Sequence, residues 1–560
     1  MGELANILPE RKELFEQTII TEEDKHLFQE LDHFFAPYND FQKKAIISDK
    51  KRICCIAGAG SGKTTVLTKR IEFLIKYKGV DPKKILAITF TRKARHEMQE
   101  RLVQAGITTN IETFNSFCEK ILRNNQFQVY GKPVRMMDHS TKLIALSFSL
   151  QSLNLKLDNI IEDYFSELQK KNKTKEELTA IFLNDCFFII DYCKAKKQEI
   201  SELSKFVSGK MGQIFLVCKT LNQYIKLHGF RSFNDQLVDT LEFFKKKLSY
   251  IPQYDYVLVD EYQDVNMQQT ELLHVFSAPH LFVVGDPRQS IFGWRGSDIN
   301  HILQFGQIYP ESETIILTKN YRSTQHIVAL MNNAIKDLQF INLEAHNKGD
   351  KNLFLHNFST EFEELSFVLE KIIQAGHKKN KIFVLARTNR QLNDVATRLK
   401  QKNIPYVIKK EDDFYQQKDE VTLSTIHAIK GLEADIVFVI GCNEQHFPCK
   451  YSDHPIMDLL NLNDYNKEHE EKRLFYVAIS RAKHTLYLTY SGKKPTYFIN
   501  NEMKLILDIQ KNERESQQPL FEKDEDFLEK DFRKAQEMED IESEDPYRTN
   551  KESWDDMISD

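Results

Sequence analysis

The chain has 560 residues, of which 41% are hydrophobic and 28% are charged, and its formal net charge is −5. This length predicts two to four domains with sizeable apolar cores. No apolar run approaches the roughly 18 residues of a transmembrane helix, and the first residues are charged, so neither a membrane span nor a secretory signal is predicted. The eight cysteines form no Cys-X-X-Cys pair, which argues against a zinc or iron–sulfur site and favours a reducing cytoplasm.

Charge is distributed unevenly along the chain. Residues 521–560 hold 16 acidic and 6 basic residues, whereas the rest of the chain holds 66 acidic and 71 basic residues. The mildly basic body is compatible with nucleic acid binding. Residues 501–560 contain few apolar residues and predict an acidic, disordered tail, which could repel DNA, mask the basic body or dock a basic partner.

From the N-terminus, residues 1–38 show helical periodicity and predict a helical extension. Residues 52–57 (RICCIA) predict a buried strand, and residues 66–75 (VLTKRIEFLI) have apolar residues at helical spacing. A glycine-rich segment, AGAGSGKTT, lies between them. Strand, glycine-rich loop and helix follow in the order that a phosphate-binding loop needs.

The residue types of this segment suit a triphosphate. Three glycines would let backbone N–H groups converge on the β- and γ-phosphates, Lys63 would reach the phosphate oxygens and Thr64 would ligate Mg²⁺. The predicted nucleotide-binding residues here are Ala57, Gly58, Ala59, Gly60, Ser61, Gly62, Lys63, Thr64 and Thr65. Ala57 stands where the strict pattern has glycine. The alternative is a glycine-rich turn that binds no ligand.

A second segment, VLVDEYQD, follows about 200 residues later. Residues 256–259 predict another buried strand, whose carboxyl end delivers Asp260 and Glu261. Asp260 would hold Mg²⁺, directly or through water, and Glu261 would polarise the attacking water. A solvated acidic strand end is the alternative, but together the two segments predict a nucleoside triphosphatase.

Further segments line up around these two. They are NDFQKKAI (39–46), AITFTRKARHEM (87–98), ETFNSF (112–117), VVGDPRQSIFGWRG (283–296), LTKNYRS (317–323), TLSTIHAIKGLEADIVFVIG (422–441) and EEKRLFYVAISRAKHTLYLTY (470–490). In order and spacing, this set resembles the superfamily 1 DNA helicases of the UvrD/Rep/PcrA type, with helicase IV close by. The resemblance covers roughly residues 39–490.

The resemblance implies an α/β fold of two RecA-like P-loop motor lobes with parallel central sheets. The implied divisions are an N-terminal helical extension (1–38), lobe 1A (39–118 and 232–317), a helical insertion 1B (119–231), lobe 2A (318–500) and the acidic tail (501–560). Lobe 2A strands are predicted at 354–358, 381–387, 421–426, 435–441 and 485–490. The short segment 409–420 stands where full-length members insert a large 2B subdomain, so 2B is predicted to be essentially missing.

The resemblance also implies a set of ATP-site residues. Gln42 would read the adenine edge, Tyr321 would stack on adenine and Glu433 would lie near the ribose and triphosphate. Gln289 would sense the γ-phosphate, Arg322 would contact it and Arg481 would act as the arginine finger. The implied catalytic set is Lys63, Asp260, Glu261, Gln289, Arg322 and Arg481. The arginines lie in the second lobe, so ATP is expected to close the cleft between the lobes.

For DNA, the resemblance and the residue types imply nine contacts. They are Phe90, Thr91, Arg92, Thr113, Asn115, Phe292, Trp294, Arg295 and His427. An exposed indole beside an arginine can stack on any base. The alternatives are a core tryptophan at 294 and a buried structural histidine at 427. Two departures stand out, because the family usually has histidine at position 115 and often has tyrosine at position 292.

The predicted function is an ATP-dependent 3′-to-5′ DNA helicase or translocase that uses ATP and Mg²⁺ and acts on single-stranded DNA and single-strand/duplex junctions in repair or replication. The alternative is a motor subunit with weak unwinding that works with a nuclease partner in repair or phage defence. A binding module with inactive catalysis is a third hypothesis. Residues 517–521 (QQPLF) resemble a sliding-clamp-binding peptide. The basic runs 170–175 and 194–197 fit either duplex phosphates or a solvated helix face.

Overall fold

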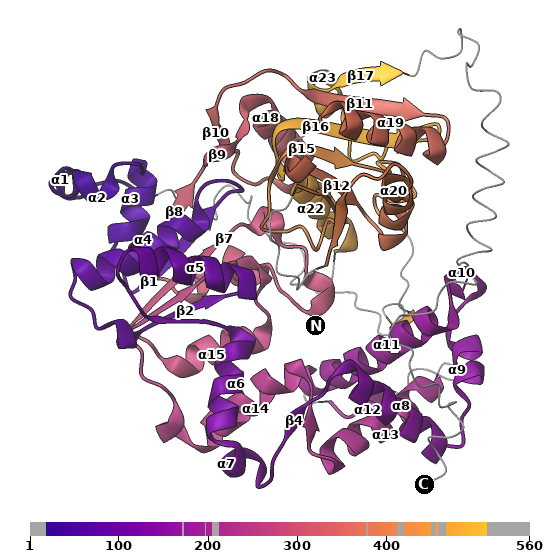
Figure 1. Ribbon diagram of the computed structural model, residues 1–560. Helices are drawn as coiled ribbons and strands as arrows, with labels where there is room; N and C mark the ends of the chain where they lie inside the picture. The colour runs from indigo at the N-terminus through magenta and orange to yellow at the C-terminus, as the bar shows by residue number, and fades with distance from the viewer. Residues whose placement is uncertain are drawn as a thin grey trace, which may run out of the picture. The chain divides into compact units, whose positions relative to one another are not determined.

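Two β-sheets organise the part of the chain that the computed structural model describes, which comprises residues 18–170, 173–196, 198–203, 212–376, 379–410, 419–449, 455–456 and 466–511 (Figure 1). The first sheet consists of β1 (Arg52–Ala57), β2 (Ile85–Thr89), β3 (Asn110–Thr113), β6 (Tyr256–Val259), β7 (His280–Gly285) and β8 (Glu313–Leu317). The second consists of β11 (Leu353–Phe358), β12 (Ile382–Ala386), β13 (Tyr406–Lys409), β14 (Val421–Thr425), β15 (Ala434–Val439), β16 (Ala482–Ser491) and β17 (Asp508–Lys511). Two strand pairs stand apart, β4 (Arg135–Met136) with β5 (Phe230–Arg231) and β9 (Lys319–Thr324) with β10 (Glu344–Asn347).

In both sheets, most neighbouring strands are not consecutive in the sequence, so crossover connections join them. The first sheet runs β3-β2-β6-β7-β1-β8, and the second runs β13-β14-β12-β15-β16-β11-β17. All neighbours in the first sheet are parallel, as are those from β13 to β11 in the second. The carboxyl ends of the strands therefore meet at one edge of each sheet, where ligands bind in such folds. The predicted fold class, an α/β chain with two RecA-like lobes, is confirmed.

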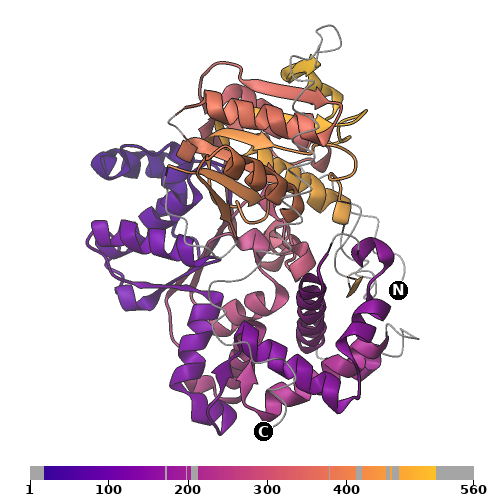
Figure 2. The same ribbon diagram turned by 45° about the vertical axis from the view of Figure 1, so that its right-hand side comes forward.

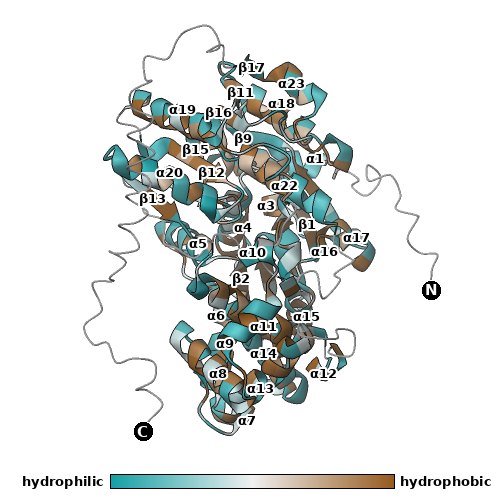
Figure 3. Cartoon of the chain, turned by 90° about the vertical axis from the view of Figure 1, so that its right-hand side faces the viewer, coloured by the Kyte–Doolittle hydropathy of each residue, from teal (hydrophilic) through white to brown (hydrophobic). Residues whose placement is uncertain are grey.

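Helices cover both faces of each sheet. We define the N-terminal lobe as the first sheet with α1 (Glu22–Glu30), α2 (Asp32–Phe35), α3 (Asp40–Ile47), α4 (Lys63–Lys76), α5 (Arg92–Gln104), α6 (Phe114–Asn124), α7 (Gln126–Tyr130), α14 (Phe233–Lys246), α15 (Met267–Phe276), α16 (Asn300–Leu303) and α17 (Phe305–Ile308). The C-terminal lobe is the second sheet with β9, β10, α18 (Gln325–Ala334), α19 (Glu361–Gln374), α20 (Asn389–Gln401), α22 (Lys467–Ile479) and α23 (Asn501–Ile506). Covering helices such as α19 and α20 carry both hydrophilic and hydrophobic residues (Figure 3).

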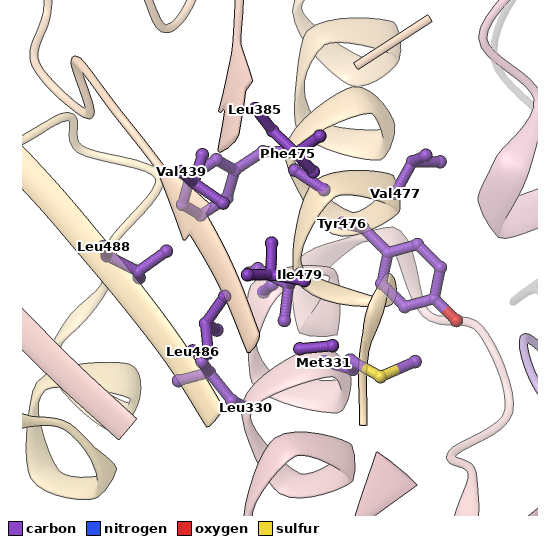
Figure 4. Close-up of a cluster of buried hydrophobic side chains, with 14 of the residues drawn as sticks. Leu330, Met331, Leu385, Val439, Phe475, Tyr476, Val477, Ile479, Leu486 and Leu488 are labelled. Atoms are coloured by element: carbon purple, nitrogen blue, oxygen red, sulfur yellow. The ribbon is translucent and has the colours of Figure 1, made fainter. Parts of the chain in front are cut away.

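The alternation of side chains along each strand builds two cores per lobe. In β1, Ile53 and Cys55 pack with α3, α4 and α5, whereas Cys54 and Ile56 pack with α6, α14 and α15. In β12, Phe383 faces the core formed with α18 and α22. Figure 4 shows that core, with Leu330 and Met331 of α18 near Leu486 and Leu488 of β16 and residues of α22. Burying each such side chain contributes about 1.5–3 kcal/mol, which fixes the strand ends that carry the site.

A helical insertion lies between β4 and β5 in the sequence. Its helices are α8 (His139–Ser152), α9 (Leu157–Tyr164), α10 (Glu167–Lys170), α11 (Lys175–Lys196), α12 (Ile200–Leu203) and α13 (Gln213–Leu227). Figure 2 shows these helices grouped together, and their buried side chains form a core of their own. Lys194 of α11 forms an ion pair with Asp235 of α14, which ties the insertion to the N-terminal lobe.

The predicted strands are confirmed with small shifts at their ends. Residues 256–259 form β6, and the five strands expected between 354 and 490 form β11, β12, β14, β15 and β16. Residues 1–17, most of the 409–420 segment and residues 512–560 lie outside the described residues, so the clamp-like peptide at 517–521 does as well. The same applies to parts of the basic runs at 170–175 and 194–197.

All eight cysteines are free thiols, and all but Cys449 are buried. Within the described ranges, no helix is long and apolar enough to cross a membrane.

Candidate functional site

The glycine-rich loop joins β1 to α4 at the carboxyl edge of the first sheet. Gly60 and Gly62 adopt left-handed conformations with φ of 70° and 86°, which other residues rarely tolerate. Gly62 is the N-cap of α4, so Lys63 begins the helix where its dipole favours an anion. Ala57 is the buried last residue of β1, and its φ is not positive. Alanine is therefore tolerated there, because the glycine-specific geometry falls on Gly60 and Gly62.

The acidic pair follows β6, as predicted. Asp260 is 2% exposed, and its Oδ1 accepts a hydrogen bond of 2.9 Å from the Glu261 backbone N–H, while Glu261 adopts a φ of 49°. Burial and the neighbouring charge of Glu261 raise the pKa of Asp260 above its ordinary value. Burial also opposes ionisation of Glu261, but Lys63 and Lys430 outweigh it and hold the pKa of Glu261 below its ordinary value. The site thus contains an ionised carboxylate, Glu261, stabilised by the charges of Lys63 and Lys430.

The predicted adenine-reading residue, Gln42, lies against the phosphate loop. Its Nε2 donates to the Ser61 carbonyl at 2.9 Å, and its Oε1 accepts from the Asn39 backbone N–H at 3.0 Å in a capping box. The other end of α3 is held by Arg70 of α4, which donates to the carbonyls of Ala45, Ile46 and Ser48. Gln42 is therefore fixed next to the loop, with its amide already engaged by protein groups.

Strand β9 touches both lobes. Asn320 Nδ2 donates to the Ala59 carbonyl at 2.7 Å, and the Tyr321 backbone N–H donates to the Gly60 carbonyl at 2.9 Å. Ser323, two residues on, donates from its hydroxyl to the Ala482 carbonyl of the C-terminal lobe at 2.6 Å. The Tyr321 hydroxyl accepts from Asn39 Nδ2 at 2.7 Å, and its ring lies 4.8 Å from that of His346. This strand joins the phosphate loop to the second lobe.

The predicted arginine finger reaches the N-terminal lobe directly. Arg481 Nη2 donates to Gln289 Oε1 at 3.0 Å, and Gln289 Nε2 in turn donates to Asp286 at 2.8 Å. Arg481 also donates to the Leu432 and Val477 carbonyls, so its guanidinium is fully held. Burial and the nearby charge of Arg322 lower its pKa to about 9, which still leaves it cationic at neutral pH.

A salt-bridge pair flanks this arginine. Arg322 Nε donates to Glu433 at 2.5 Å, and Lys483 binds the other oxygen of the same carboxylate at 2.6 Å. Burial opposes the ionisation of Glu433, but Arg322 and Lys483 lower its pKa to about 2. Arg322 also donates to the Ser480 carbonyl at 3.0 Å, next to Arg481. The structure thus brings Arg322, Glu433 and Arg481 together, as the sequence predicts.

Three residues of this site were missed at the sequence level. Lys430 forms a buried ion pair with Asp264 and donates to the Gln289 carbonyl at 2.6 Å. Asn320 anchors the phosphate loop, as described above. Lys430 precedes Glu433 in the motif KGLE, and Asp264 ends the motif DEYQD. The positions of Lys430 and Asp264 in these motifs could have marked them as site residues. Their pairing could not be predicted, because it joins residues 166 positions apart.

The first set of predicted DNA contacts lies where β2 and β3 end. Thr91 and Arg92 are exposed, and Thr91 caps α5 by accepting from the Ala94 N–H at 3.1 Å. Thr113 caps α6 in the same way, through Ser116. Asn115, in the first turn of α6, is partly exposed. The Phe90 ring is partly buried against Phe114. Polar groups of two neighbouring strand ends are therefore presented at one edge.

The second set gathers aromatic residues from both lobes. The Trp294 and His427 rings meet edge to face, 6.3 Å apart at 90°, and Phe292 lies 6.2 Å from His427. The Arg295 guanidinium lies 4.4 Å from the Trp294 ring. Burial and the charges of Arg387, Arg295 and Lys430 lower the pKa of His427 to about 3, so it is a neutral imidazole.

Exposure separates the members of this cluster. Trp294 is partly exposed, which suits a stacking surface, but Phe292 is only 8% exposed and belongs to the core of the C-terminal lobe. Phe292 thus packs into this core in the structure, and its contact with DNA stays a prediction. Its ring is covered by Lys430, 5.1 Å from the centroid, and by Arg295 at 5.4 Å.

Comparisons with known protein families agree with this geometry. Residues 38–310 match the UvrD/REP helicase N-terminal domain, and residues 315–419 and 409–493 match the UvrD-like helicase C-terminal domain. These matches cover most of the chain. The chain therefore belongs to the UvrD/REP helicase family.

Several curated relatives resemble the chain. It is 32% identical over 402 residues to the probable DNA helicase II homolog of Mycoplasma capricolum, covering 67% of this chain and 52% of that protein. It is 31% identical over 418 residues to the ATP-dependent DNA helicase PcrA of Staphylococcus epidermidis, covering 71% and 54%. A probable DNA helicase of Mycoplasma pneumoniae is 29% identical over 475 residues, covering 80% and 82%. The chain spans about half the length of the first two relatives.

Proposed function

We propose that the chain is an ATP-dependent DNA motor that moves 3′ to 5′ on single-stranded DNA and unwinds duplex ahead of it. The observation that carries this proposal is the meeting of two half-sites. The phosphate loop and acidic pair belong to the N-terminal lobe, whereas Arg322 and Arg481 come from the C-terminal lobe. A triphosphate bound between them would be completed only when both lobes contact it, which is how hydrolysis can drive lobe motion.

The chemistry proposed for this site is phosphoryl transfer to water. Lys63 and the loop N–H groups would hold the triphosphate, Glu261 would orient and polarise the water, and Arg481 would stabilise charge that develops on the transferred phosphoryl group. Gln289, which hydrogen-bonds to both Arg481 and Asp286, would report the γ-phosphate to the second lobe.

Mg²⁺ fits the residues present. Asp260 is a buried carboxylate whose pKa is raised by burial and by Glu261, so a nearby cation would favour its ionised form. Within the described residues, no group of three or more His, Cys, Asp or Glu side chains could hold a metal alone, which suits an ion shared with phosphate oxygens. Thr64 and Asp260 are the proposed protein ligands, and the ion would neutralise phosphate charge.

For DNA, we propose that the strand lies along the strand ends that carry Phe90–Arg92, Thr113 and Asn115 and stacks on Trp294. Arg295 and His427 complete this surface. The partial exposure of Trp294 and the exposure of Arg92 support it. Because stacking and phosphate contacts read no sequence, such a surface suits a motor that must pass over any base.

The proposed organisation remains the division stated above, with a 1B-like insertion and little or no 2B. Strand β13 ends at Lys409, and its neighbour β14 begins at Val421. The two matches to the C-terminal family domain meet at residues 409–419, the same place. Both observations support a motor that lacks the 2B subdomain.

The second candidate is a motor subunit with little unwinding of its own. The short 409–420 segment favours it, because regulation absent from the chain would come from a nuclease or another partner. A sliding clamp could be such a partner through Gln517–Phe521. The catalytically inactive alternative is disfavoured, because Lys63, Asp260, Glu261, Gln289, Arg322 and Arg481 are all present.

Unwinding of 3′-tailed and 5′-tailed duplexes by the purified chain tests the proposal, with ATP hydrolysis followed with and without single-stranded DNA. Unwinding of the 3′-tailed substrate alone is expected. DNA-stimulated hydrolysis without unwinding would favour the motor-subunit alternative, and no hydrolysis at all would contradict both.

A further inference from the structure

Lys430 lies where the aromatic cluster meets the hydrolysis site. It belongs to the turn after β14, which also carries His427, and its side chain is 9% exposed. Its ammonium lies 5.1 Å from the centroid of Phe292, whose ring lies 6.2 Å from His427. His427 in turn contacts Trp294. One short segment of the C-terminal lobe therefore touches the proposed DNA surface.

The same ammonium is bound by two groups of the N-terminal lobe. It pairs with Asp264 Oδ2 and donates to the Gln289 carbonyl at 2.6 Å. Gln263 Nε2 donates both to Asp264 Oδ2 at 3.1 Å and to Glu261 Oε2 at 2.6 Å. The Asp264 carboxylate and the Gln263 amide thus connect Lys430 to Glu261, the proposed water-polarising residue. Lys430 also binds directly to the backbone carbonyl of Gln289, the proposed γ-phosphate sensor.

The pair is expected to be sensitive to lobe position. Asp264 is 1% exposed, and its Oδ1 is buried with no hydrogen-bond partner in the described part of the chain. A buried carboxylate that loses its cation is left uncompensated, which is strongly unfavourable. Any movement that withdraws Lys430 would therefore be transmitted to the segment 260–264.

We propose that Lys430 is the positioning residue that couples DNA binding to ATP hydrolysis, acting through its ion pair with Asp264 and its bond to the Gln289 carbonyl. This inference rests on the proposed function and assigns the coupling to one side chain. DNA that contacts Trp294 and His427 would set the turn that carries Lys430. Lys430 would in turn hold Glu261 and Gln289 in the hydrolytic arrangement.

Steady-state ATP hydrolysis, with and without a single-stranded oligonucleotide, tests the proposal. Lys430→Met is expected to lower the stimulation by DNA by roughly 5- to 150-fold, the usual range for coupling between two sites. The loss should fall on kcat, with a smaller change in KM for ATP, because Lys430 is placed to act on Glu261 and Gln289. Lys430→Arg, which keeps the cation, should recover part of the stimulation.

A double-mutant cycle isolates the ion pair. Asp264→Asn should also lower the stimulation, and the double variant with Lys430→Met should be little worse than either single variant. Lys472→Met is the matched control, because Lys472 pairs with Asp337 inside the C-terminal lobe and should leave the stimulation unchanged. Melting temperatures identify any variant that fails to fold. If Lys430→Met fails to fold, Lys430→Arg and Asp264→Asn are used to test the proposal instead.

The outcomes are distinguishable. A wild-type chain whose hydrolysis ignores DNA would overturn the proposed function itself. A wild type that is stimulated, together with a folded Lys430→Met variant that is stimulated equally, would overturn only the role of Lys430. Additive losses in the double variant would likewise overturn action through Asp264.

Discussion

The two lobes share one architecture but contribute different groups to the site. Each has a parallel sheet whose strand ends carry polar residues. The N-terminal lobe contributes a glycine-rich loop and the buried acidic pair Asp260 and Glu261. The C-terminal lobe contributes Arg481 and Lys430, both of which reach groups of the first lobe. Under the proposed function, the first lobe would hold the triphosphate and the second would respond to it.

Under the proposed function, this division of groups explains how a nucleotide would act as a signal between the lobes. A phosphate loop alone would bind a triphosphate whether or not the second lobe is near. If the cations of the second lobe stabilise mainly the charge that develops during reaction, as proposed, they would raise the rate more than the affinity. Substitutions that remove the contribution of one lobe at a time should show whether that lobe serves nucleotide binding or turnover.

The largest effect is expected from the N-terminal lobe. Lys63→Ala should abolish measurable ATP turnover, a loss of at least about 10³-fold, because it removes the cation at the phosphate loop. Hydrolysis assays with and without DNA provide the measurement. Lys69→Ala on the same helix, whose side chain pairs with Glu72, is the control and should remain active. Persistent turnover in Lys63→Ala would refute the assignment of the loop.

The second effect tests the C-terminal lobe. Arg481→Ala should reduce kcat by about 10³-fold, as for other arginine fingers, while nucleotide affinity changes far less. Affinity is measured with a fluorescent ATP analogue, and kcat is measured separately. Arg398→Ala, on α20 and stacked on Phe362, is the matched control. Equal losses in affinity and kcat would show that the second lobe also binds the ground state, which would weaken the division proposed here.

The sequence predicts the fold well because its signals are local. The buried strand 256–259 is a continuous apolar run, and its limits agree with β6. The phosphate loop is likewise recognisable from neighbouring residues alone. The predicted helix at 66–75 in fact begins at Lys63, because the left-handed conformation of Gly62 caps it there. Such shifts depend on backbone geometry that periodicity does not report.

Local signals do not predict contacts between distant segments; the grouping of Arg322, Glu433 and Arg481 followed from the family resemblance, and other such contacts were not predicted. The pairing of Lys430 with Asp264 requires both lobes to be placed, and no spacing rule links them. The burial of Phe292 is another example, since an aromatic residue next to Trp294 has the same sequence pattern whether it is exposed or covered. The engagement of Gln42 with Ser61 also depends on how α3 packs against the loop.

A smaller effect is expected at the proposed DNA surface, which both lobes share. Trp294→Ala should weaken single-stranded DNA binding by roughly 5- to 150-fold, the value of one base stack. Fluorescence anisotropy of a labelled oligonucleotide measures this change. Phe362→Ala, an exposed aromatic of α19, is the control. Unchanged affinity would mean that Trp294 is only an edge of the core, and the surface would then need another stacking residue.

The smallest effect concerns a third element, the attachment of the helical insertion. Burial raises the pKa of Asp239 to about 6, and the nearby charges of Asp235 and Glu242 also raise it. The Tyr130 hydroxyl, which donates to Asp239 at 2.6 Å, and the charge of Lys194 oppose this rise. An unfolded aspartate titrates near about 3.9. The folded state therefore holds the proton more tightly, so this contribution to stability is complete below about pH 4 and is lost as pH rises through about 6.

Asp239→Asn removes this titration while leaving an acceptor for Tyr130. Relative to the wild type, the variant should gain stability between pH 5 and pH 7, by at most about 1.4 kcal/mol per pH unit. Thermal unfolding at both pH values measures the difference. A difference that does not change with pH would mean that Asp239 is already ionised in the fold. A gain in stability of this kind would show that α14 carries a proton-sensitive contact. This helix also binds Lys194 of the insertion, and it lies outside both half-sites.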